Sequence, residues 1–336
     1  MRLKQKGRKD EIGQRLDKMK GKFILSCEST VDIPYTYMKK RNIPVIFYAY
    51  EAEGRRFTDD MGRHPEKLQD FYRLLEEGKR PVTAPIEEQA YEMFFEKLIQ
   101  KGNVLHIAFG SGMSISLFHA EKAAEKLRKK YPGRKLLVID SLCSCCGYGL
   151  LVDEAADMRD AGHTMGEVRD WLKENRQRLH HQFYTTQLDY YRNSGRMVGA
   201  AATTAALFGI WPILRLDDRG RIVVYDAARG MDEAIKMTVD TMEQHARDGL
   251  KYSGKCWIAH SDCPEDAEKA KQEIAFRFPK IKGEIPIWNI GMITASHCGP
   301  GTLLVCFWGD ERPKEQEPMA AAIESAVLTA RGDMEL

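Results

Sequence analysis

A histidine followed by a Gly-Pro-Gly turn stands near the end of the chain. His297 directly precedes Cys298 and the Gly-Pro-Gly sequence at 299–301, and an apolar run follows. An imidazole donates or accepts hydrogen bonds and changes charge near neutral pH, and glycine lets the backbone turn tightly or approach another group closely. These residues fit a turn that happens to contain a histidine. They equally fit a site in which His297 contacts a ligand.

Polar residues follow four of the expected strands. In an open parallel sheet, ligands bind beyond the carboxyl ends of the strands, and the free N–H groups at a helix N-terminus favour an oxyanion. We therefore expect an anion site, with the Gly/Ser segment before Leu117 as its best candidate; simple helix capping by Ser and Thr is the alternative. The four positions are Cys27-Glu28-Ser29-Thr30, Thr83, segment 110–116 and Asp140-Ser141.

Familiar catalytic motifs are absent from the sequence. There is no Gly-x-Ser-x-Gly elbow, no phosphate-binding Walker loop and no Gly-x-Gly-x-x-Gly after a strand. Cys27 as a nucleophile with His297 as its base is conceivable, but nothing in the sequence places the two together. His106 lies in an apolar strand and is expected to be a hydrogen-bonded core residue. The histidines expected to be solvated are His119, His163, His180, His181 and His245.

Eight cysteines raise the question of disulfides or a metal. Three of them lie in the Cys-Ser-Cys-Cys sequence at 143–146, and no second ligand cluster follows at zinc spacing. Cysteine often behaves as a small buried apolar residue, and that is the expectation here. A metal or redox site built on Cys143–Cys146 remains the alternative.

The first half of the chain alternates strands with helices. Strands are expected at 22–29, 42–54, 103–112 and 135–141. Helices are expected from about Tyr35, with Asp32 as N-cap, and at 64–78, 86–102 and 116–133. Such alternation predicts a parallel sheet with helices on both faces.

The pattern changes after about residue 165. A helix is expected at 166–179, and hairpin-like strands at 181–188, 211–228, 254–262 and 283–293, which predicts a mixed or antiparallel sheet with helices on it. The expected organisation is a basic tail (1–21), an α/β/α domain (22–165), a mixed-sheet α/β domain (166–310) and a C-terminal extension (311–336), for which the Ala-rich sequence predicts a helix.

Composition limits the classes of function. The chain has 336 residues and a net charge of +2, with 43% hydrophobic and 30% charged residues, so it can bury a core and carries no global charge for nucleic acid. Residues 1–22 hold nine Lys/Arg against three Asp/Glu without an apolar segment, so they are no secretory signal. The uncharged stretch 197–214 is weakly apolar. We interpret it as a buried helix ending near Gly209, then a strand after Pro212, and not as a membrane span.

Seven segments in order resemble the DegV family of fatty-acid-binding proteins, over about residues 22–308. The resemblance departs from the family pattern at Glu28, where Asp is usual, at Ile115, where Gly is usual, and at Ser194, where the first Gly of a Gly-Gly-Arg-Ile sequence is usual. The segments are CESTVDIP (27–34), VTAP (82–85), GSGMSIS (110–116), IDSLCSCCGYGLLV (139–152), QLDYYRNSGRMVGAAA (187–202), ARG (228–230) and SHCGPGTLLVCF (296–307).

The resemblance implies a fold and a function. The fold would be a two-domain α/β structure, with a three-layer α/β/α parallel-sheet domain and a two-layer mixed-sheet domain. A long-chain fatty acid such as palmitate would lie in a tunnel between them, and a separate fatty acid kinase would convert the presented acid to an acyl-phosphate. The chain itself would be a cytoplasmic, monomeric lipid-binding protein with no catalytic residue, metal or cofactor, no nucleic-acid partner and no membrane span.

The resemblance also implies roles for particular residues. Thr83, Ser114 and the Ile115 N–H would hold the carboxylate, with His297 nearby. Arg196 and Arg229 would meet the kinase. The head-group loops would comprise Glu28, Ser29, Ser116, Gly299 and Gly301.

Two other functions stay open from the sequence. The first is an enzyme related to the dihydroxyacetone kinases, which attach a small hydroxylated substrate covalently through a histidine. The second is the metal or redox protein considered above. The bulkier Ile115 in the head-group loop also leaves an altered chain-length preference or a different ligand possible.

Overall fold

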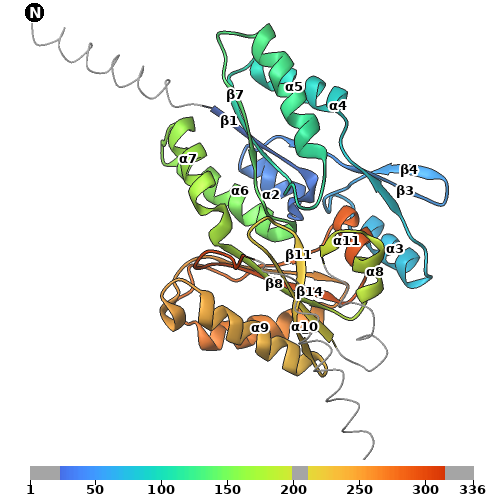
Figure 1. The fold of residues 1–336 in the computed structure, drawn as a ribbon. Helices are drawn as coiled ribbons and strands as arrows, with labels where there is room; N and C mark the ends of the chain where they lie inside the picture. The colour runs from blue at the N-terminus through green and yellow to red at the C-terminus, as the bar shows by residue number, and fades with distance from the viewer. Residues whose placement is uncertain (1–22, 199–210, 315–336) are drawn as a thin grey trace, which may run out of the picture.

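A parallel sheet of four strands forms the upper part of the molecule in Figure 1. The computed structural model describes residues 23–198 and 211–314. The strand order is β2-β1-β6-β7, and every neighbouring pair is parallel. The strands are β1 (Phe23–Glu28), β2 (Val45–Ile46), β6 (Asn103–Ala108) and β7 (Leu136–Asp140).

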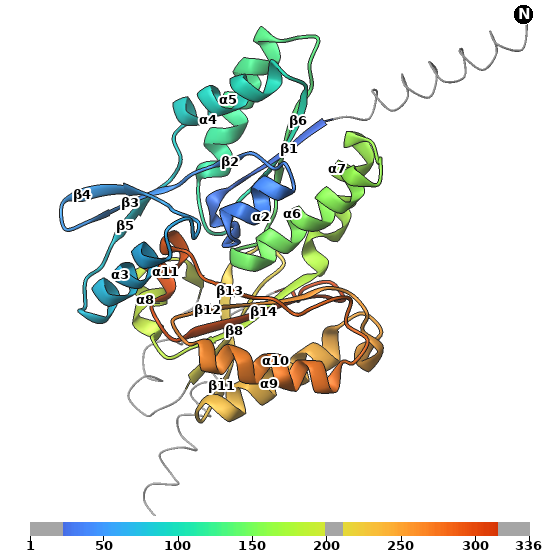
Figure 2. The same ribbon diagram turned by 180° about the vertical axis from the view of Figure 1, so that it is seen from behind.

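Helices cover both faces of this sheet, as Figure 2 shows. Helices α4 (Glu88–Ile99) and α5 (Ser116–Lys130) pack together on one face. Helices α2 (Tyr35–Lys40), α6 (Cys145–Asp160) and α7 (Met165–Asn175) lie on the other. The strands are buried almost throughout because both faces are covered, which explains their nearly continuous apolar sequences. The predicted three-layer arrangement is confirmed.

A small antiparallel sheet, β4-β3-β5, was not expected from the sequence. It comprises β3 (Ala49–Ala52), β4 (Arg55–Thr58) and β5 (Val82–Ala84), with α3 (Pro65–Glu76) between the last two in sequence. The segment 42–54, predicted as one strand, is therefore two strands in different sheets. Thr83 lies on β5 and pairs with Tyr50, so its predicted place at the end of a parallel strand is wrong.

The lower sheet has seven strands in the order β13-β12-β14-β8-β10-β11-β9. Only the pairs β9–β11 and β12–β13 are parallel, so the predicted mixed sheet is confirmed. Helices α9 (Met231–His245) and α10 (Pro264–Arg277) cover one face, and α6 contacts the other. The strands are β8 (Leu179–Thr185), β9 (Met197–Val198), β10 (Trp211–Leu216), β11 (Ile222–Ala228), β12 (Cys256–Ser261), β13 (Ile287–Asn289) and β14 (Thr302–Trp308).

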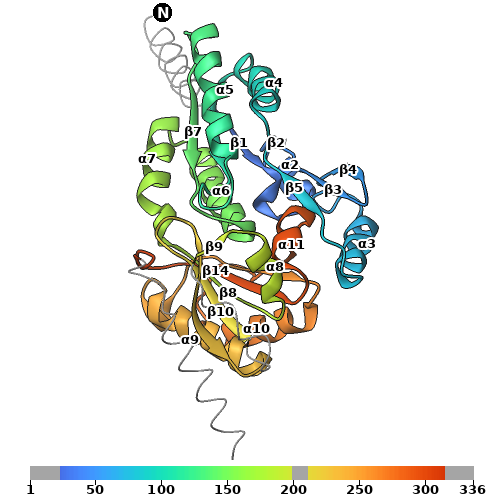
Figure 3. The same cartoon turned by 45° about the vertical axis from the view of Figure 1, so that its right-hand side comes forward.

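Two short helices lie where the sheets meet. Figure 3 shows α8 (Leu188–Asn193) and α11 (Met292–Cys298) between the lower sheet and α3. These two helices contact each other, and α11 also contacts β5. Because α11 ends with His297 and Cys298, His297 lies where the upper and lower sheets meet.

Some predictions of local structure are wrong. Asp32 is not the N-cap of α2: it ends the 3-10 turn Ser29–Val31 with φ 47°, and α2 begins after Pro34. His180 and His181 are not solvated. Each is 1% exposed, because β8 lies between α9 on one face and α6 on the other.

Other predictions fall partly or wholly on residues that the structure leaves undescribed. Of the segment predicted as a helix and then a strand, 199–210 is not described, Met197–Val198 is strand β9, and the strand at Pro212 is confirmed as β10. The basic tail and the C-terminal helix lie outside the described residues, and the domain boundaries stay a prediction. Among the described residues, no helix has the length and apolar character needed to cross a membrane.

Candidate functional site

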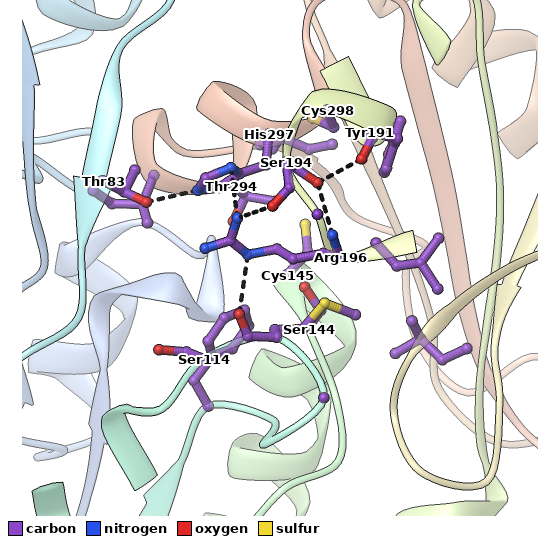
Figure 4. A pocket seen from close by; sticks show the side chains of 18 of the residues that line it. Thr83, Ser114, Ser144, Cys145, Tyr191, Ser194, Arg196, Thr294, His297 and Cys298 are labelled. Carbon is purple, nitrogen blue, oxygen red and sulfur yellow. Dashed lines mark hydrogen bonds between the residues drawn. The ribbon is translucent and has the colours of Figure 1, made fainter. Parts of the chain in front are cut away.

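A cavity of about 490 Å³ lies between the upper and lower sheets. Its size falls within the roughly 300–1,000 Å³ that is typical of small-molecule sites. Polar side chains gather in one part of it, as Figure 4 shows. The apolar part of the wall comes mostly from the lower sheet and the helices beside it. That wall includes Phe109, Met113, Phe183, Leu216, Ile222, Ile290, Ile293 and Leu304.

His297 connects Thr83 with Arg196 across the polar part of the cavity. An Arg196 Nη1–H donates to His297 Nδ1 at 3.1 Å, and His297 Nε2 lies 2.7 Å from Thr83 Oγ1. Because arginine only donates, Nδ1 must accept, so Nε2 carries the proton and donates it to Thr83. The Thr83 hydroxyl hydrogen is then free to point at a ligand. The three side chains form a directed chain of hydrogen bonds that ends in a hydroxyl donor.

The positive charge of this site belongs to Arg196 and not to His297. Burial, and then the neighbouring Arg196 charge, lower the pKa of His297 from 6.5 to about 3. The imidazole is therefore neutral near pH 7, which rules out the cationic role that its sequence position allowed. Burial also lowers the pKa of Arg196, but a guanidinium stays protonated in proteins.

Arg196 joins the two halves of the cavity wall. Its guanidinium donates to the carbonyl oxygen of Met113 at 3.0 Å and to that of Ser194 at 2.8 Å, besides His297. Met113 directly precedes Ser114, so this contact fixes the Gly/Ser loop of the upper sheet. Arg196 lines the cavity, whereas the resemblance had placed it at an encounter with a kinase.

Ser114 belongs to a cluster of hydroxyl groups at the start of α5. Its Oγ donates to Ser116 Oγ at 3.0 Å and accepts from the Ser116 N–H at 3.2 Å. The Tyr48 hydroxyl lies 3.4 Å from Ser114 Oγ. Ser116 Oγ in turn accepts from the Ile86 N–H. Ser116 is fully buried and positions Ser114, while Ser114 and Tyr48 themselves line the cavity.

Ile115 fits its place without backbone strain. It is the N-cap of α5 with φ −80°, a conformation open to any residue, so the usual family glycine is not required there. Its side chain lies at the edge of the cavity and is 63% exposed. Within the described residues, the Ile115 N–H has no hydrogen-bond partner, so this donor is available to a ligand.

Glu28 and Ser29 lie behind the cavity wall. Glu28 is fully buried and accepts hydrogen bonds from Tyr48 at 3.1 Å and Tyr91 at 2.6 Å, and His106 Nε2 lies 3.4 Å away. Ser29 Oγ accepts from the Tyr48 N–H. Neither residue lines the cavity, so their part in the head-group region is to hold Tyr48 in place.

The Gly-Pro-Gly turn also lies outside the cavity lining. Gly299 has φ +67°, and a Cβ there would lie 2.3 Å from the Tyr190 ring. Gly301 has φ +76°, and a Cβ would lie 2.1 Å from Thr186 Oγ1. Both contacts are impossible for a side chain, so the turn requires glycine. The turn ends α11 and fixes the position of His297, but it does not itself line the cavity.

Arg229 lies apart from the cavity. It follows β11 and precedes α9, and it is exposed. Its backbone N–H donates to the Glu233 carboxylate. The resemblance had assigned Arg229 and Arg196 the same role, but in the structure Arg229 is exposed and Arg196 lines the cavity.

The cysteines behave as the sequence predicted. All eight are free, and seven of them are buried. Cys145 and Cys298 line the cavity, and burial raises the pKa of each thiol, so both are protonated near pH 7. Cys27 is buried outside the cavity lining, which separates it from His297. Among the described residues, no group of three metal-ligating side chains includes a cysteine.

Several site features escaped the sequence interpretation. Tyr48 and the cavity position of Arg196 were missed, as were two buried acids, Asp32 and Asp59, in a neighbouring cavity. Burial raises the pKa of Asp32 to about 7 and that of Asp59 to about 6. For Tyr48, the sequence did offer a signal: its polar hydroxyl stands in an otherwise apolar segment, just after Val45–Ile46.

The fold and the cavity together define a class of protein. It is an α/β binding protein with a mostly apolar cavity between two sheets and a cluster of hydrogen-bond donors in one part of it. A family model described as an uncharacterised protein, DegV family, matches residues 22–309. The chain belongs to the DegV family.

Relatives of this chain include proteins with known structures. A DegV domain-containing protein of Clostridium perfringens is 31% identical over 292 residues, which cover 87% of this chain and 99% of that protein. A DegV lipid-binding protein of Thermotoga maritima is 23% identical with a TM-score of 0.74, covering 87% of this chain and 99% of its own. The Fatty Acid Kinase (Fak) B3 protein of Streptococcus pneumoniae, loaded with linoleic acid, is 18% identical with a TM-score of 0.72, covering 86% and 99%.

A third solved structure is similar over the same part of the chain. A DegV family protein of Thermus thermophilus, described by its fatty acid binding, is 21% identical with a TM-score of 0.75, covering 85% of this chain and 99% of its own. At these identities the solved structures show the fold, which confirms the predicted α/β architecture.

Proposed function

We propose that this protein binds a long-chain fatty acid and presents it to a separate fatty acid kinase. The carboxylate accepts from the Thr83 hydroxyl, the Ile115 N–H and the Ser114 hydroxyl, whose hydrogen turns from Ser116 toward the ligand. The acyl chain occupies the apolar part of the cavity as a tunnel. No cofactor takes part. The solved relatives described as fatty-acid-binding proteins support this ligand class.

The single observation that carries the proposal is the charge of Arg196. This guanidinium is part-buried in the cavity wall, and all its hydrogen-bond acceptors are neutral: two backbone carbonyls and His297. No carboxylate of the described residues pairs with it. A buried cation without an acidic partner is costly, and an anionic ligand nearby offsets that cost. A carboxylate with a hydrocarbon chain matches both the charge and the apolar wall.

The acyl chain supplies most of the affinity in this account. Each buried CH₂ contributes roughly 0.8 kcal/mol, so about 15 of them contribute on the order of 12 kcal/mol before the costs of association. The polar contacts then fix which end of the ligand lies at Thr83. Two apolar residues of the lower sheet, Phe183 and Leu304, face the cavity from neighbouring strands and form part of the surface for that chain.

Presentation to the kinase is assigned to the surface around Arg229. This residue is exposed, whereas Arg196 lies within the cavity wall, so we propose that Arg196 serves the ligand head group and Arg229 the partner. The Fak B3 relative carries the name of a fatty acid kinase, which is why a kinase is the proposed partner.

The hydrogen bonds of His297 argue against the alternative of a covalently acting kinase. An adduct on the imidazole needs a ring nitrogen with a free lone pair facing the substrate. Here Nδ1 accepts from Arg196 and Nε2 carries its proton toward Thr83, so neither nitrogen is free. Incubation with dihydroxyacetone followed by intact-mass spectrometry is expected to show no adduct.

Lipid extraction of the purified protein tests the proposed ligand. Native mass spectrometry before extraction is expected to show a bound mass that denaturation releases, and the extract is expected to contain one C14–C18 fatty acid per chain. The Arg196→Gln variant, purified in parallel, is expected to carry less. A wild-type protein with no fatty acid that also fails to bind one in titration would overturn the proposal.

A further inference from the structure

Three side chains with metal-binding atoms meet on the far side of the lower sheet. They are His180 near the start of β8, His245 at the end of α9 and Asp310 just after β14. One ligand atom from each lies within 4.8 Å of the others. These residues come from three distant parts of the chain, and the fatty-acid site uses none of them.

The backbone holds this group together. The Asp310 N–H donates to the His245 carbonyl oxygen at 3.0 Å, and the Gly309 N–H donates to the Arg178 carbonyl oxygen at 2.8 Å. A Cβ on Gly309 would lie 2.2 Å from the His245 oxygen and 2.9 Å from His180 Cδ2. Only glycine therefore permits this close approach, and the three side chains are arranged before any ligand arrives.

The side-chain geometry is close to that of a zinc site. Asp310 Oδ1 lies 3.0 Å from His180 Nε2 and 3.2 Å from His245 Nδ1. Zinc binds nitrogen and oxygen at about 2.0–2.2 Å in a tetrahedron, which separates neighbouring ligand atoms by about 3.4 Å. A small outward movement of each group would therefore admit the ion.

Packing orients the two imidazoles. The His180 ring stacks on Phe307 with a centroid distance of 5.1 Å and an interplanar angle of 7°, and on His245 at 5.2 Å and 24°. The His180 side chain is 1% exposed, whereas those of His245 and Asp310 are 26% and 59% exposed. His180 is thus fixed in the core, and the more exposed His245 and Asp310 leave the site open to an ion from solvent.

We propose that His180 Nε2, His245 Nδ1 and one Asp310 carboxylate oxygen bind a divalent cation of the zinc class, with water as the fourth ligand. Each imidazole binds through the nitrogen that now faces Asp310, so its proton moves to the other ring nitrogen or to solvent. His245 closes α9, and the C-terminal end of a helix dipole favours a cation.

The ion would fasten the end of α9 and the segment after β14 to strand β8. Strand β8 is shared with the fatty-acid cavity, because His181, the residue after His180, lines that cavity. The existence of the site does not depend on the proposed fatty-acid function.

Calorimetric titration of Zn²⁺ into the full-length protein, treated with EDTA and desalted, tests the proposal. We expect one Zn²⁺ per chain, and affinity reduced at least tenfold in His245→Ala and in Asp310→Asn. His64→Ala is the matched control, because His64 Nδ1 lies 2.7 Å from Asp60 Oδ1 in a His–Asp pair that contains no second imidazole. That variant is expected to bind like the wild type.

Cobalt spectroscopy distinguishes this site from a cysteine site. Co²⁺ is expected to give visible d–d bands without the near-ultraviolet charge-transfer band of a thiolate, and His245→Ala is expected to lose those bands. Zn²⁺ is also expected to raise the thermal unfolding midpoint of the wild type and not that of Asp310→Asn. Absence of saturable Zn²⁺ binding, or binding that survives both variants, would overturn the proposal.

Discussion

Replacing Thr83 by Val tests the directed chain of hydrogen bonds that ends at this residue. Valine keeps the shape of threonine but removes the hydroxyl that accepts from His297 Nε2 at 2.7 Å and points its own hydrogen at the ligand. A hydrogen bond to a charged group contributes about 1.5–3 kcal/mol. We therefore expect the Kd for a C16 fatty acid to rise about 10- to 150-fold.

Thr83→Ser is the matched control for this experiment. Serine restores the hydroxyl without the methyl group, so its affinity is expected to lie close to that of the wild type. Both variants are first delipidated and checked by circular dichroism, and Kd is then measured by displacement of a fluorescent fatty acid. Because the apolar contacts are unchanged, the loss is expected to be the same for a C14 and a C18 acid.

The pH dependence of binding tests the charge assignment in the same assay. His297, with its pKa lowered to about 3, stays neutral between pH 6 and 9, so binding is expected to be flat over that range. If His297 were the cation, affinity would fall as the pH rises through about 6.5. Such a fall, or a Thr83→Val variant as tight as the wild type, would refute the reasoning.

Further predictions concern two arginines and a buried acid. Arg196→Gln is expected to weaken fatty-acid binding at least tenfold, whereas Arg229→Ala is expected to leave it unchanged and to slow acyl-phosphate formation in a reconstituted kinase assay; the reverse pattern would exchange their roles. Asp32, whose pKa burial raises to about 7, retains a proton in the folded state that it loses on unfolding. The free energy of unfolding therefore falls as the pH rises from about 4 to about 7, at up to about 1.4 kcal/mol per unit. Urea denaturation is expected to show a smaller fall for Asp32→Asn, and equal slopes would contradict this.

Sequence patterns identified two segments of the candidate site, but they did not show how these segments contact Thr83 and Arg196. The Gly/Ser loop before α5 and the His297 motif were identified, because glycine, serine and histidine at element ends are local signals. That Thr83 belongs to a separate antiparallel sheet was not foreseen, since a three-residue strand carries no periodicity.

Other features could not be predicted from the sequence, because they depend on which helices and strands pack over a residue. His180 and His181 looked polar and exposed, yet every residue of β8 is buried because helices cover both faces of that sheet. The position of Arg196 in the cavity wall depends on how the two sheets meet. The proton position on His297 follows from its contact with Arg196, and its lowered pKa follows mainly from burial, so neither could be predicted from the sequence.

A structure of the protein with bound palmitate tests the central claim most directly. We predict a carboxylate oxygen about 2.5–3.0 Å from Thr83 Oγ1 and a second contact to Ser114 Oγ or the Ile115 N–H, with the acyl chain along Phe183 and Leu304. His297 is predicted to lie behind Thr83 with its bond to Arg196 intact. A carboxylate at the opposite end of the cavity, or a cavity that stays closed to the acid, would contradict the account.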